Sequence, residues 1–233
     1  INLCDNVTVL RRGQVVGNTI AKDSNPRQLA ELMVGREVAI QLQKAPATLG
    51  QEVLSVHALQ VEDDRGVAAV RNISFQLHAG EILSIAGVDG NGQRELADAI
   101  AGLRSIKAGK ILLDGRDITL WHPQKRVQQL KVGYIPEDRQ TMGLIMGFSI
   151  ANNLILKAFT KLPFVRRFFL QKQVIQKNAE TKIQQFDIRA SDGNVKVSQL
   201  SGGNQQKVVL ARELDREPSL IIAMQPTRGL DVG

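Results

Sequence analysis

The sequence predicts an α/β protein that combines a parallel sheet with antiparallel strands and a separate helical region. A short apolar run at 81–86 leads into a glycine-rich stretch at 87–92 and then into a helical pattern at 95–100. A glycine pair at 202–203 precedes another helical pattern, which the apolar run 220–224 follows. Strands that are separated by helices in this way pair in parallel, because a crossover connection must join them.

The composition of the 233 residues is that of an ordinary globular protein, with 43% hydrophobic and 23% charged residues. Aromatic residues make up 4%, so we expect a core of Leu, Ile, Val and Ala. The single cysteine, Cys4, excludes an internal disulfide and fits a reducing compartment. No apolar run approaches the roughly 20 residues that span a bilayer, and no secretory signal opens the chain. These features predict a cytoplasmic protein with a peripheral membrane role at most.

The formal net charge of +7 is compatible with a nucleic-acid or anionic-membrane partner. The basic residues are nevertheless spread along the chain, without a long block and without interleaved aromatic residues. That pattern favours a solvated surface over a nucleic-acid site.

The first 52 residues are expected to form a small unit and a linker. Residues 7–16 read as two short strands around a turn, and Ser24-Asn25-Pro26 starts a helix that Gly35 ends. This unit is too small to hold a core, so we expect it to be the tail of something upstream. Residues 40–52 lack periodicity and read as a linker. The chain begins with Ile1 and stops after a strand that a helix would normally cover, which predicts a fragment cut at both ends.

A second unit is expected from about residue 53. Strands are predicted at 53–61 and 67–77, a hairpin around Asp114-Gly115, and a buried strand at 131–136. Residues 150–190 read as helical. Their apolar cluster, Phe164–Leu170, could belong to the core or to a docking face, and the core is the favoured interpretation.

One glycine-rich stretch has the frame of a phosphate-binding loop, G-x-x-x-x-G-K-[ST], whose backbone N–H groups surround phosphate oxygens. It consists of Gly87, Val88, Asp89, Gly90, Asn91, Gly92, Gln93 and Arg94. Gln93 replaces the lysine and cannot supply its charge. Arg94 replaces the Ser or Thr and has no acceptor for magnesium. By itself, the stretch fits a structural glycine turn as well as a degenerate nucleotide loop.

The second glycine motif is the most specific signal. It reads Leu200, Ser201, Gly202, Gly203, Asn204 and Gln205, and a helical pattern follows it. A hydroxyl, two flexible backbone donors and a helix N-terminus would converge there on a phosphate. A serine-capped helix after a glycine turn would look alike locally, but the neighbouring motifs favour the phosphate interpretation. The stretch closely resembles the signature of ATP-binding cassette (ABC) ATPases.

The resemblance to ABC ATPases extends to three further motifs. Two of them depart from the usual residues, and the third also has a simpler interpretation. The strand 220–224 resembles the Walker B strand, where Met224 replaces the magnesium-binding Asp and Gln225 the general-base Glu. A thioether is a poor magnesium ligand, and an amide cannot take a proton from water. Glu137 stands where the Q-loop usually has glutamine. Asp231 matches the D-loop aspartate, with an ordinary turn aspartate as the alternative.

These departures resemble one group: the second cassettes of tandem ATPases that serve simple-sugar and nucleoside importers. Members of that group carry GNGQ, YIPEDR, LSGGNQQK and QPTRGLDVG, all of which occur here. The resemblance implies a P-loop NTPase-type ABC nucleotide-binding domain with antiparallel β and α-helical subdomains. It implies that 1–39 is the tail of a first cassette, 40–52 a linker, and 53–233 a second cassette truncated after the D-loop. The residues at positions 93, 224 and 225 lean toward the nucleoside branch.

In ABC ATPases, each ATP lies between the phosphate loop of one cassette and the signature of the other. The resemblance therefore implies that the pocket of this chain is weak or silent, and that its signature completes a site on the first cassette. ATP and Mg²⁺ would act mainly there, so the full-length protein would be a transport ATPase and this chain alone inactive. The implied partners are the first cassette, the permease subunits and, indirectly, an extracytoplasmic binding protein. Residues 150–175 would meet the permease at the cytoplasmic face of the inner membrane.

Two other functions stay open. A soluble tandem ABC protein acting on ribosomes or nucleic acid would suit the basic charge, but such proteins generally keep lysine and glutamate in both cassettes and carry a long charged linker. This chain has neither. A nucleotide-binding module without turnover is the other alternative, and the ATPase activity of the chain alone would distinguish it.

Overall fold

The computed structural model describes residues 3–11, 13–35 and 46–230, and these fall into two compact units that divide near Pro46. In the smaller unit, β1 (Asn6–Arg11) and β2 (Gln14–Ile20) form an antiparallel pair, and a short 3₁₀ turn, η1 (Ala21–Asp23), leads to α1 (Pro26–Val34). Asn25 and Gln28 form a capping box at the start of α1. Gly35 ends the helix with a φ of 83°, in the left-handed region. Both predicted strands and the predicted helix are confirmed.

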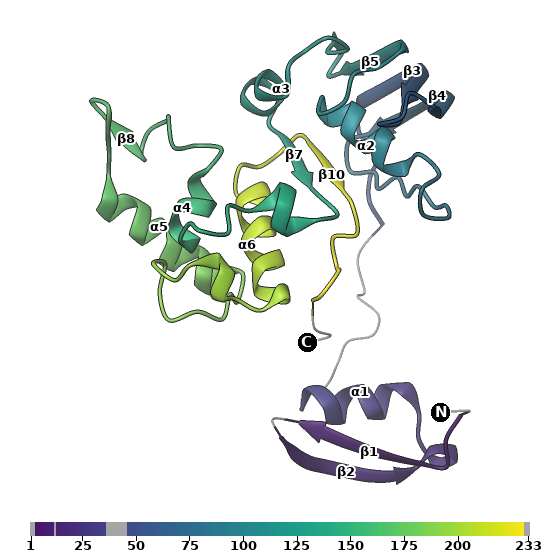
Figure 1. Cartoon of the computed structure of the whole chain (residues 1–233), viewed down its shortest axis with the longest axis vertical. Coiled ribbons are helices and arrows are strands. Elements are labelled where there is room, and N and C mark those ends of the chain that lie inside the picture. The colour runs from purple at the N-terminus through teal and green to yellow at the C-terminus, as the bar shows by residue number, and fades with distance from the viewer. Residues whose placement is uncertain (1–2, 12, 36–45, 231–233) are drawn as a thin grey trace. The chain divides into compact units, whose positions relative to one another are not determined.

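Residues 40–45 of the predicted linker 40–52 lie outside the described residues, and residues 46–51 form neither helix nor strand before a strand begins at Glu52. From there the larger unit, Ala47–Leu230, begins with an antiparallel sheet (Figure 1). Its strand order is β4 (Ala68–His78), β3 (Glu52–Glu62), β5 (Ala108–Leu113), β6 (Arg116–Asp117). The hairpin predicted at Asp114-Gly115 is the β5–β6 turn. Apolar side chains of β3 and β5 pack with α2 (Gln93–Ala101) in a first core cluster.

Two strands that come later in the chain form a separate parallel pair. β7 (Val132–Ile135) follows α3 (Pro123–Gln129), and β10 (Leu220–Ala223) lies parallel to β7 in register, as predicted for 220–224. The helix α6 (Gly202–Leu214) precedes β10 and begins at the second glycine motif. Both glycine motifs therefore stand at helix N-termini, as the sequence predicts.

The strand expected at 81–86 is not formed. These residues make no ladder with another strand among the described residues, and Ile82 is 82% exposed. The apolar run was read as a buried strand, but apolarity supplies no hydrogen-bonding partner. Within the described part of the chain, β10 pairs with β7 on one side, and its other edge is not paired with 81–86.

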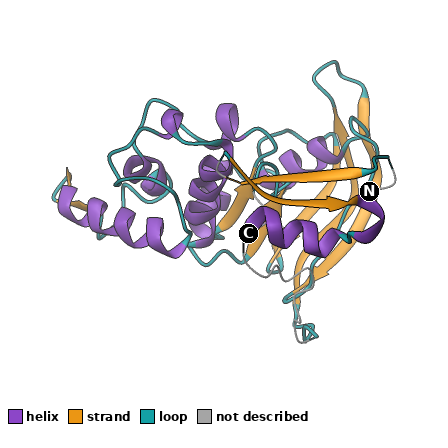
Figure 2. Cartoon of the chain, turned by 90° about the horizontal axis from the view of Figure 1, so that it is seen from below, coloured by secondary structure: helices purple, strands orange, loops and turns teal. Residues whose placement is uncertain are grey.

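The helical part of the larger unit contains α4 (Ile150–Ile155), α5 (Lys172–Gln185) and α6, with a π-helical turn η2 (Arg139–Gly143) and a 3₁₀ turn η3 (Val197–Gln199). Figure 2 draws the helices in purple, and apolar side chains of this part of the chain form a second core cluster. The prediction of continuous helix over 150–190 is wrong in the middle, where β8 (Val165–Arg166) and β9 (Phe169–Leu170) form a hairpin. Phe164 packs against the second cluster, but Phe168–Leu170 are exposed, so the core interpretation holds only for the first part of that segment. No helix in the described ranges has the length and apolarity to cross a bilayer.

Candidate functional site

The glycine loop is held in a conformation that requires glycine. Gly92 caps α2 with a φ of 95°, and a Cβ there would collide with the backbone oxygen of Ala69. Gln93, the first residue of the helix, folds back and donates a hydrogen bond from Nε2 to the Val88 oxygen at 3.1 Å. Its amide also lies against Gly87, where a Cβ would meet it. The Gln93 side chain therefore closes on its own loop, and it brings no charge to the place where phosphate would sit.

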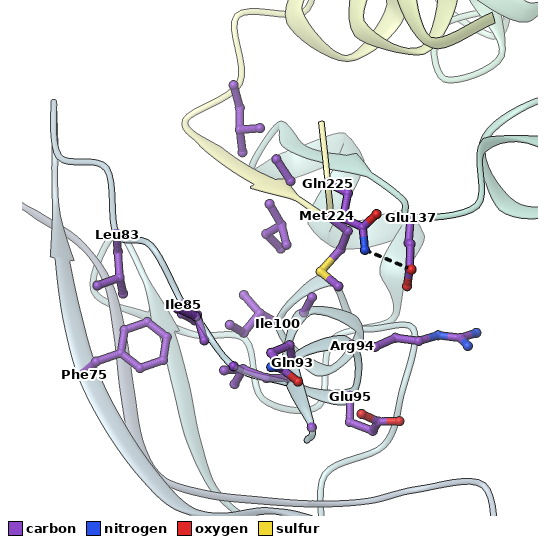
Figure 3. Close-up of a pocket in the computed structure, with 18 of the residues that line it drawn as sticks. Phe75, Leu83, Ile85, Gln93, Arg94, Glu95, Ile100, Glu137, Met224 and Gln225 are labelled. Atoms are coloured by element: carbon purple, nitrogen blue, oxygen red, sulfur yellow. Dashed lines mark hydrogen bonds between the residues drawn. The ribbon is translucent and has the colours of Figure 1, made fainter. Parts of the chain in front are cut away.

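A pocket of about 690 Å³ lies beside this loop. One wall is apolar, formed by side chains such as Phe75, Leu83 and Ile85, and the other wall is polar (Figure 3). The lining includes Glu137, Met224 and Gln225. It also includes most of the predicted nucleotide-binding positions, namely Gly87, Asp89, Gly90, Gly92, Gln93 and Arg94. The structure thus brings together residues that are far apart in sequence. No residue of 200–205 lines this pocket.

The Arg94 guanidinium forms an ion pair with a carboxylate of its own helix. Its Nε lies 3.7 Å from the buried carboxylate of Asp98, one turn further along α2. Asp98 also accepts a hydrogen bond from the Tyr134 hydroxyl at 2.6 Å. Burial, together with this carboxylate, raises the pKa of Tyr134, so the hydroxyl stays protonated and donates. The position at which a phosphate loop offers a hydroxyl to magnesium is thus occupied by a paired cation.

At the polar wall, an amide and a carboxylate face each other. Gln225 Nε2 donates to Glu137 Oε1 at 3.1 Å (Figure 3), and Arg228 Nη1 lies 3.6 Å from the same oxygen. The two residues that the sequence resemblance assigns to the Q-loop and general-base positions are therefore hydrogen-bonded to each other. Met224 lies next to the pair with its thioether in the pocket.

These side chains do not fit Mg²⁺. Magnesium takes oxygen ligands in an octahedral arrangement, whereas the two positions that should supply them hold the Arg94 guanidinium and the Met224 thioether. In the described part of the chain, no group of three or more His, Cys, Asp or Glu residues is placed to hold a metal ion. Arg94, Met224 and Gln225 themselves offer no carboxylate to a metal ion or to an attacking water, and the carboxylates that line the pocket are Asp89, Glu95 and Glu137.

The signature forms an exposed, well-capped helix start. Ser201 Oγ accepts hydrogen bonds from Asn204, from its backbone N–H at 3.4 Å and from Nδ2 at 2.9 Å. Gln205 is buried and donates to the backbone oxygens of Val197 and Leu200, at 3.1 and 3.2 Å. Ser201 itself is exposed, and its hydroxyl hydrogen is not used in these contacts. An exposed serine hydroxyl thus stands at a helix N-terminus beside Gly202 and Gly203, a combination suited to a phosphate.

Arg139 connects this signature to the turn after β10. Its Nη1 donates to the Arg228 oxygen at 3.3 Å, and its guanidinium lies against Gly202. Gly203 approaches the same turn so closely that a Cβ would lie 2.7 Å from the Gly229 oxygen. Sequence reasoning assigned no role to Arg139, although it is the last residue of the YIPEDR motif. Asp231, the predicted D-loop residue, lies outside the described residues.

A buried carboxylate that the sequence did not single out joins the helical part to β7. Glu213 is 1% exposed and accepts from Lys157 Nζ at 2.6 Å and from Arg212 Nε at 2.9 Å. It also accepts from the backbone N–H of Tyr134 at 3.2 Å. Its signal in the sequence is its spacing, because Glu213 stands four positions after the buried Val209 and so lies on the same face of α6. The network fixes the strand that leads directly to Glu137.

A glycine loop and a serine-glycine motif, each opening a helix beside a parallel strand pair, define a nucleotide-binding cassette. The family model for ABC transporters matches residues 70–228, and the chain belongs to this family. The fold agrees: a dimeric ABC cassette, MJ0796, in a post-hydrolysis state with ADP and Pi superposes with a TM-score of 0.65 at 24% identity, covering 76% of each chain. A nucleotide-free cassette of an ABC transporter gives a TM-score of 0.61 at 19% identity, covering 77% of this chain and 71% of that one.

Curated relatives are similar over nearly the whole chain. The guanosine import ATP-binding protein NupO of Bacillus subtilis is 45% identical over 99% of this chain and 45% of its own length. The nucleoside import ATP-binding protein NupA of Lactococcus lactis is 43% identical over 99% of this chain and 46% of its own length. The ribose import ATP-binding protein RbsA of Geobacillus kaustophilus is 36% identical over 99% and 45%. The chain thus spans about half the length of the relatives it matches.

Proposed function

We propose that the chain is part of the ATP-binding subunit of an ABC importer for nucleosides or simple sugars, and that it serves ATP hydrolysis through its signature. One observation carries this proposal: the LSGGNQ motif opens a helix at the exposed Ser201, while the chain's own pocket has Gln93, Arg94, Met224 and Gln225 at the positions expected to bind phosphate and metal and to activate water. The nucleoside and sugar import proteins among the relatives support the substrate class. The two with higher identity act on nucleosides or guanosine, which favours that branch.

The pocket beside the glycine loop is proposed to be silent in catalysis. Loss of a general base alone removes a rate factor of roughly 10²–10⁴. The Gln93 amide donates to its own loop, and the Gln225 amide donates to the Glu137 carboxylate. A nucleotide entering here would meet neither a lysine nor a metal site.

The signature, by contrast, is proposed to act on a nucleotide held by another cassette. No residue of 200–205 lines the chain's own pocket and Ser201 is exposed, so these groups are proposed to meet a phosphate held by a facing domain. Arg139 and the 226–229 turn support its glycines from behind. That nucleotide would be bound by the first cassette of the same polypeptide, where ATP and Mg²⁺ would act.

The proposal includes the organisation of the longer protein. Residues 1–39 would be the tail of the first cassette, and 53–233 most of the second. The protein would associate with transmembrane permease subunits at the cytoplasmic face of the membrane and be served indirectly by a substrate-binding protein. The helical segment at 150–175 is the proposed permease contact, and a cross-link map that places it away from the permease would reject that assignment.

ATP hydrolysis by the full-length protein tests the proposal. Ser201→Ala or Gly203→Asp should nearly abolish turnover, because each removes or blocks a phosphate donor of the signature. Gln93→Ala should leave turnover almost unchanged, because that side chain serves only its own loop. The opposite ranking would overturn the proposal. The 233-residue chain alone should show no appreciable ATPase activity, and turnover by it would contradict the role given to Met224 and Gln225.

A further inference from the structure

The net charge of the chain comes from one stretch. Residues 139–179 contain no Asp or Glu but seven Lys and Arg. The rest of the chain is therefore balanced, with 23 basic and 23 acidic residues, and the whole formal charge of +7 belongs to this stretch. The basic residues are spread along the chain, but the acidic residues are absent from this stretch.

The β8–β9 hairpin lies in the middle of this stretch. Val165 pairs with Leu170 and Arg166 with Phe169, which leaves Arg167 and Phe168 as a two-residue turn. Both turn residues have positive φ, 47° and 71°, as a type I′ turn requires. Asn and Gly are the usual residues there, since bulky side chains are strained in this region. The strained backbone therefore includes Phe168, whose side chain is fully exposed.

The tip of the hairpin is apolar and exposed. Phe168 is 101% exposed, Phe169 75% and Leu162 77%. The base, however, is fixed: Phe164 packs against the second core cluster, and the Gln171 N–H donates to the Phe164 oxygen at 2.9 Å. In Figure 1, β8 lies at an outer end of the helical part of the larger unit. The aromatic side chains therefore project from an anchored support.

Basic side chains surround these aromatics. Lys161, Arg166, Arg167 and Lys172 are exposed, and none of them makes an ion pair with a described residue. Lys157 is different, since Glu213 neutralises it. Aromatic residues flanked by lysine and arginine are the combination found where proteins meet the headgroup region of a bilayer. The aromatic rings enter the interface while the cations meet anionic lipids.

We propose that the hairpin segment 161–172 binds the surface of an anionic lipid bilayer, with Phe168 and Phe169 inserted at the headgroup level. A narrow two-stranded tip suits a bilayer better than a protein partner, because it offers no broad face to bury. The complete lack of acidic residues over 139–179 suits a uniformly anionic surface. This inference does not depend on the signature's proposed role in ATP hydrolysis, and it confines the permease contact proposed for 150–175 to the residues of that segment outside the hairpin segment, 150–160 and 173–175.

Vesicle co-sedimentation of the full chain tests the proposal. Vesicles of phosphatidylserine with phosphatidylcholine should bind the chain, and pure phosphatidylcholine vesicles should bind it far less. Arg166→Gln with Arg167→Gln should weaken partitioning about 30-fold, since each basic residue near such a surface contributes a factor of roughly 5. Phe168→Ser with Phe169→Ser should weaken it at least about tenfold. The matched controls are Arg116→Gln and Leu120→Ser, which change an exposed cation and a 92%-exposed leucine elsewhere and should bind like the parent.

A second measurement locates the contact. In a Trp121→Phe background, Phe168→Trp should shift its emission to the blue and be quenched by brominated lipids in anionic vesicles. The native protein, whose single tryptophan is Trp121, should not be quenched and serves as the control. Absence of vesicle binding overturns the proposal, as does binding that the hairpin variants leave unchanged. Capture of the hairpin by a purified permease without any vesicle binding would likewise overturn it in favour of a protein partner.

Discussion

Replacing Gly203 by alanine should destabilise the chain, although alanine is the better helix former. The helix would gain about 0.5–1 kcal/mol from the substitution. The new Cβ, however, would lie 2.7 Å from the Gly229 oxygen, a backbone atom that cannot rotate away. Overpacking of this kind costs about 1–3 kcal/mol. The net loss of unfolding free energy, the difference between these two contributions, should therefore lie between about 0 and 2.5 kcal/mol and centre near about 1 kcal/mol.

Gly202→Ala is the matched control. A Cβ at this position meets only the end of the Arg139 side chain, which can swing aside. The helix gain should then dominate, so the variant should be neutral or more stable by up to about 1 kcal/mol. Urea unfolding of the 233-residue chain, followed by far-ultraviolet circular dichroism, measures both. Equal stabilities, or a less stable Gly202→Ala variant, would refute the packing of the signature against the 226–229 turn.

Three further predictions concern buried and titrating groups. Glu213→Ala should cost about 3–5 kcal/mol in urea unfolding, because Lys157 and Arg212 lose their buried acceptor; Glu213→Gln should cost less, and equal losses would count against the role of the charge. Arg126→Met should cost about 2–4 kcal/mol, since its guanidinium donates to the Ala99 and Ile100 oxygens at the end of α2; a neutral result would contradict this cap. Hydrogen bonds from the Thr141 side chain and from backbone N–H groups lower the pKa of Asp138, so the unfolded chain takes up this proton first as pH falls. Stability from Asp138 should be present above about pH 4 and lost below it, and Asp138→Asn should reduce that loss in acid unfolding curves.

The fold could be predicted where local patterns and pairing agree. The parallel strand 220–224, the capped helix ending at Gly35 and the helix starts after both glycine motifs all follow from periodicity and cap residues. The strand at 81–86 was mispredicted because apolarity does not reveal whether a pairing edge exists. The hairpin at 165–170 was mispredicted because short apolar runs suit helix and strand alike. Its turn also contains neither Asn nor Gly, the residues that usually mark one.

The candidate site was predictable in its residues but not in its contacts. The substitutions at Gln93, Arg94 and Met224 are visible in the motifs themselves. The Glu137–Gln225 hydrogen bond joins residues 88 positions apart, and only the parallel pairing of β7 with β10 brings them together. The return of the Gln93 amide to its own loop depends on a rotamer, which no motif specifies.

Vanadate photocleavage of the full-length protein tests most directly whether the signature works on a partner's nucleotide. Vanadate trapped with ADP takes the place of the γ-phosphate, and ultraviolet light then cuts the backbone that touches it. A signature acting in trans predicts cleavage within Ser201–Gly203 and none within the glycine loop 87–92. Cleavage in the glycine loop without cleavage at the signature would contradict it, because the chain's own pocket would then hold the hydrolysed nucleotide.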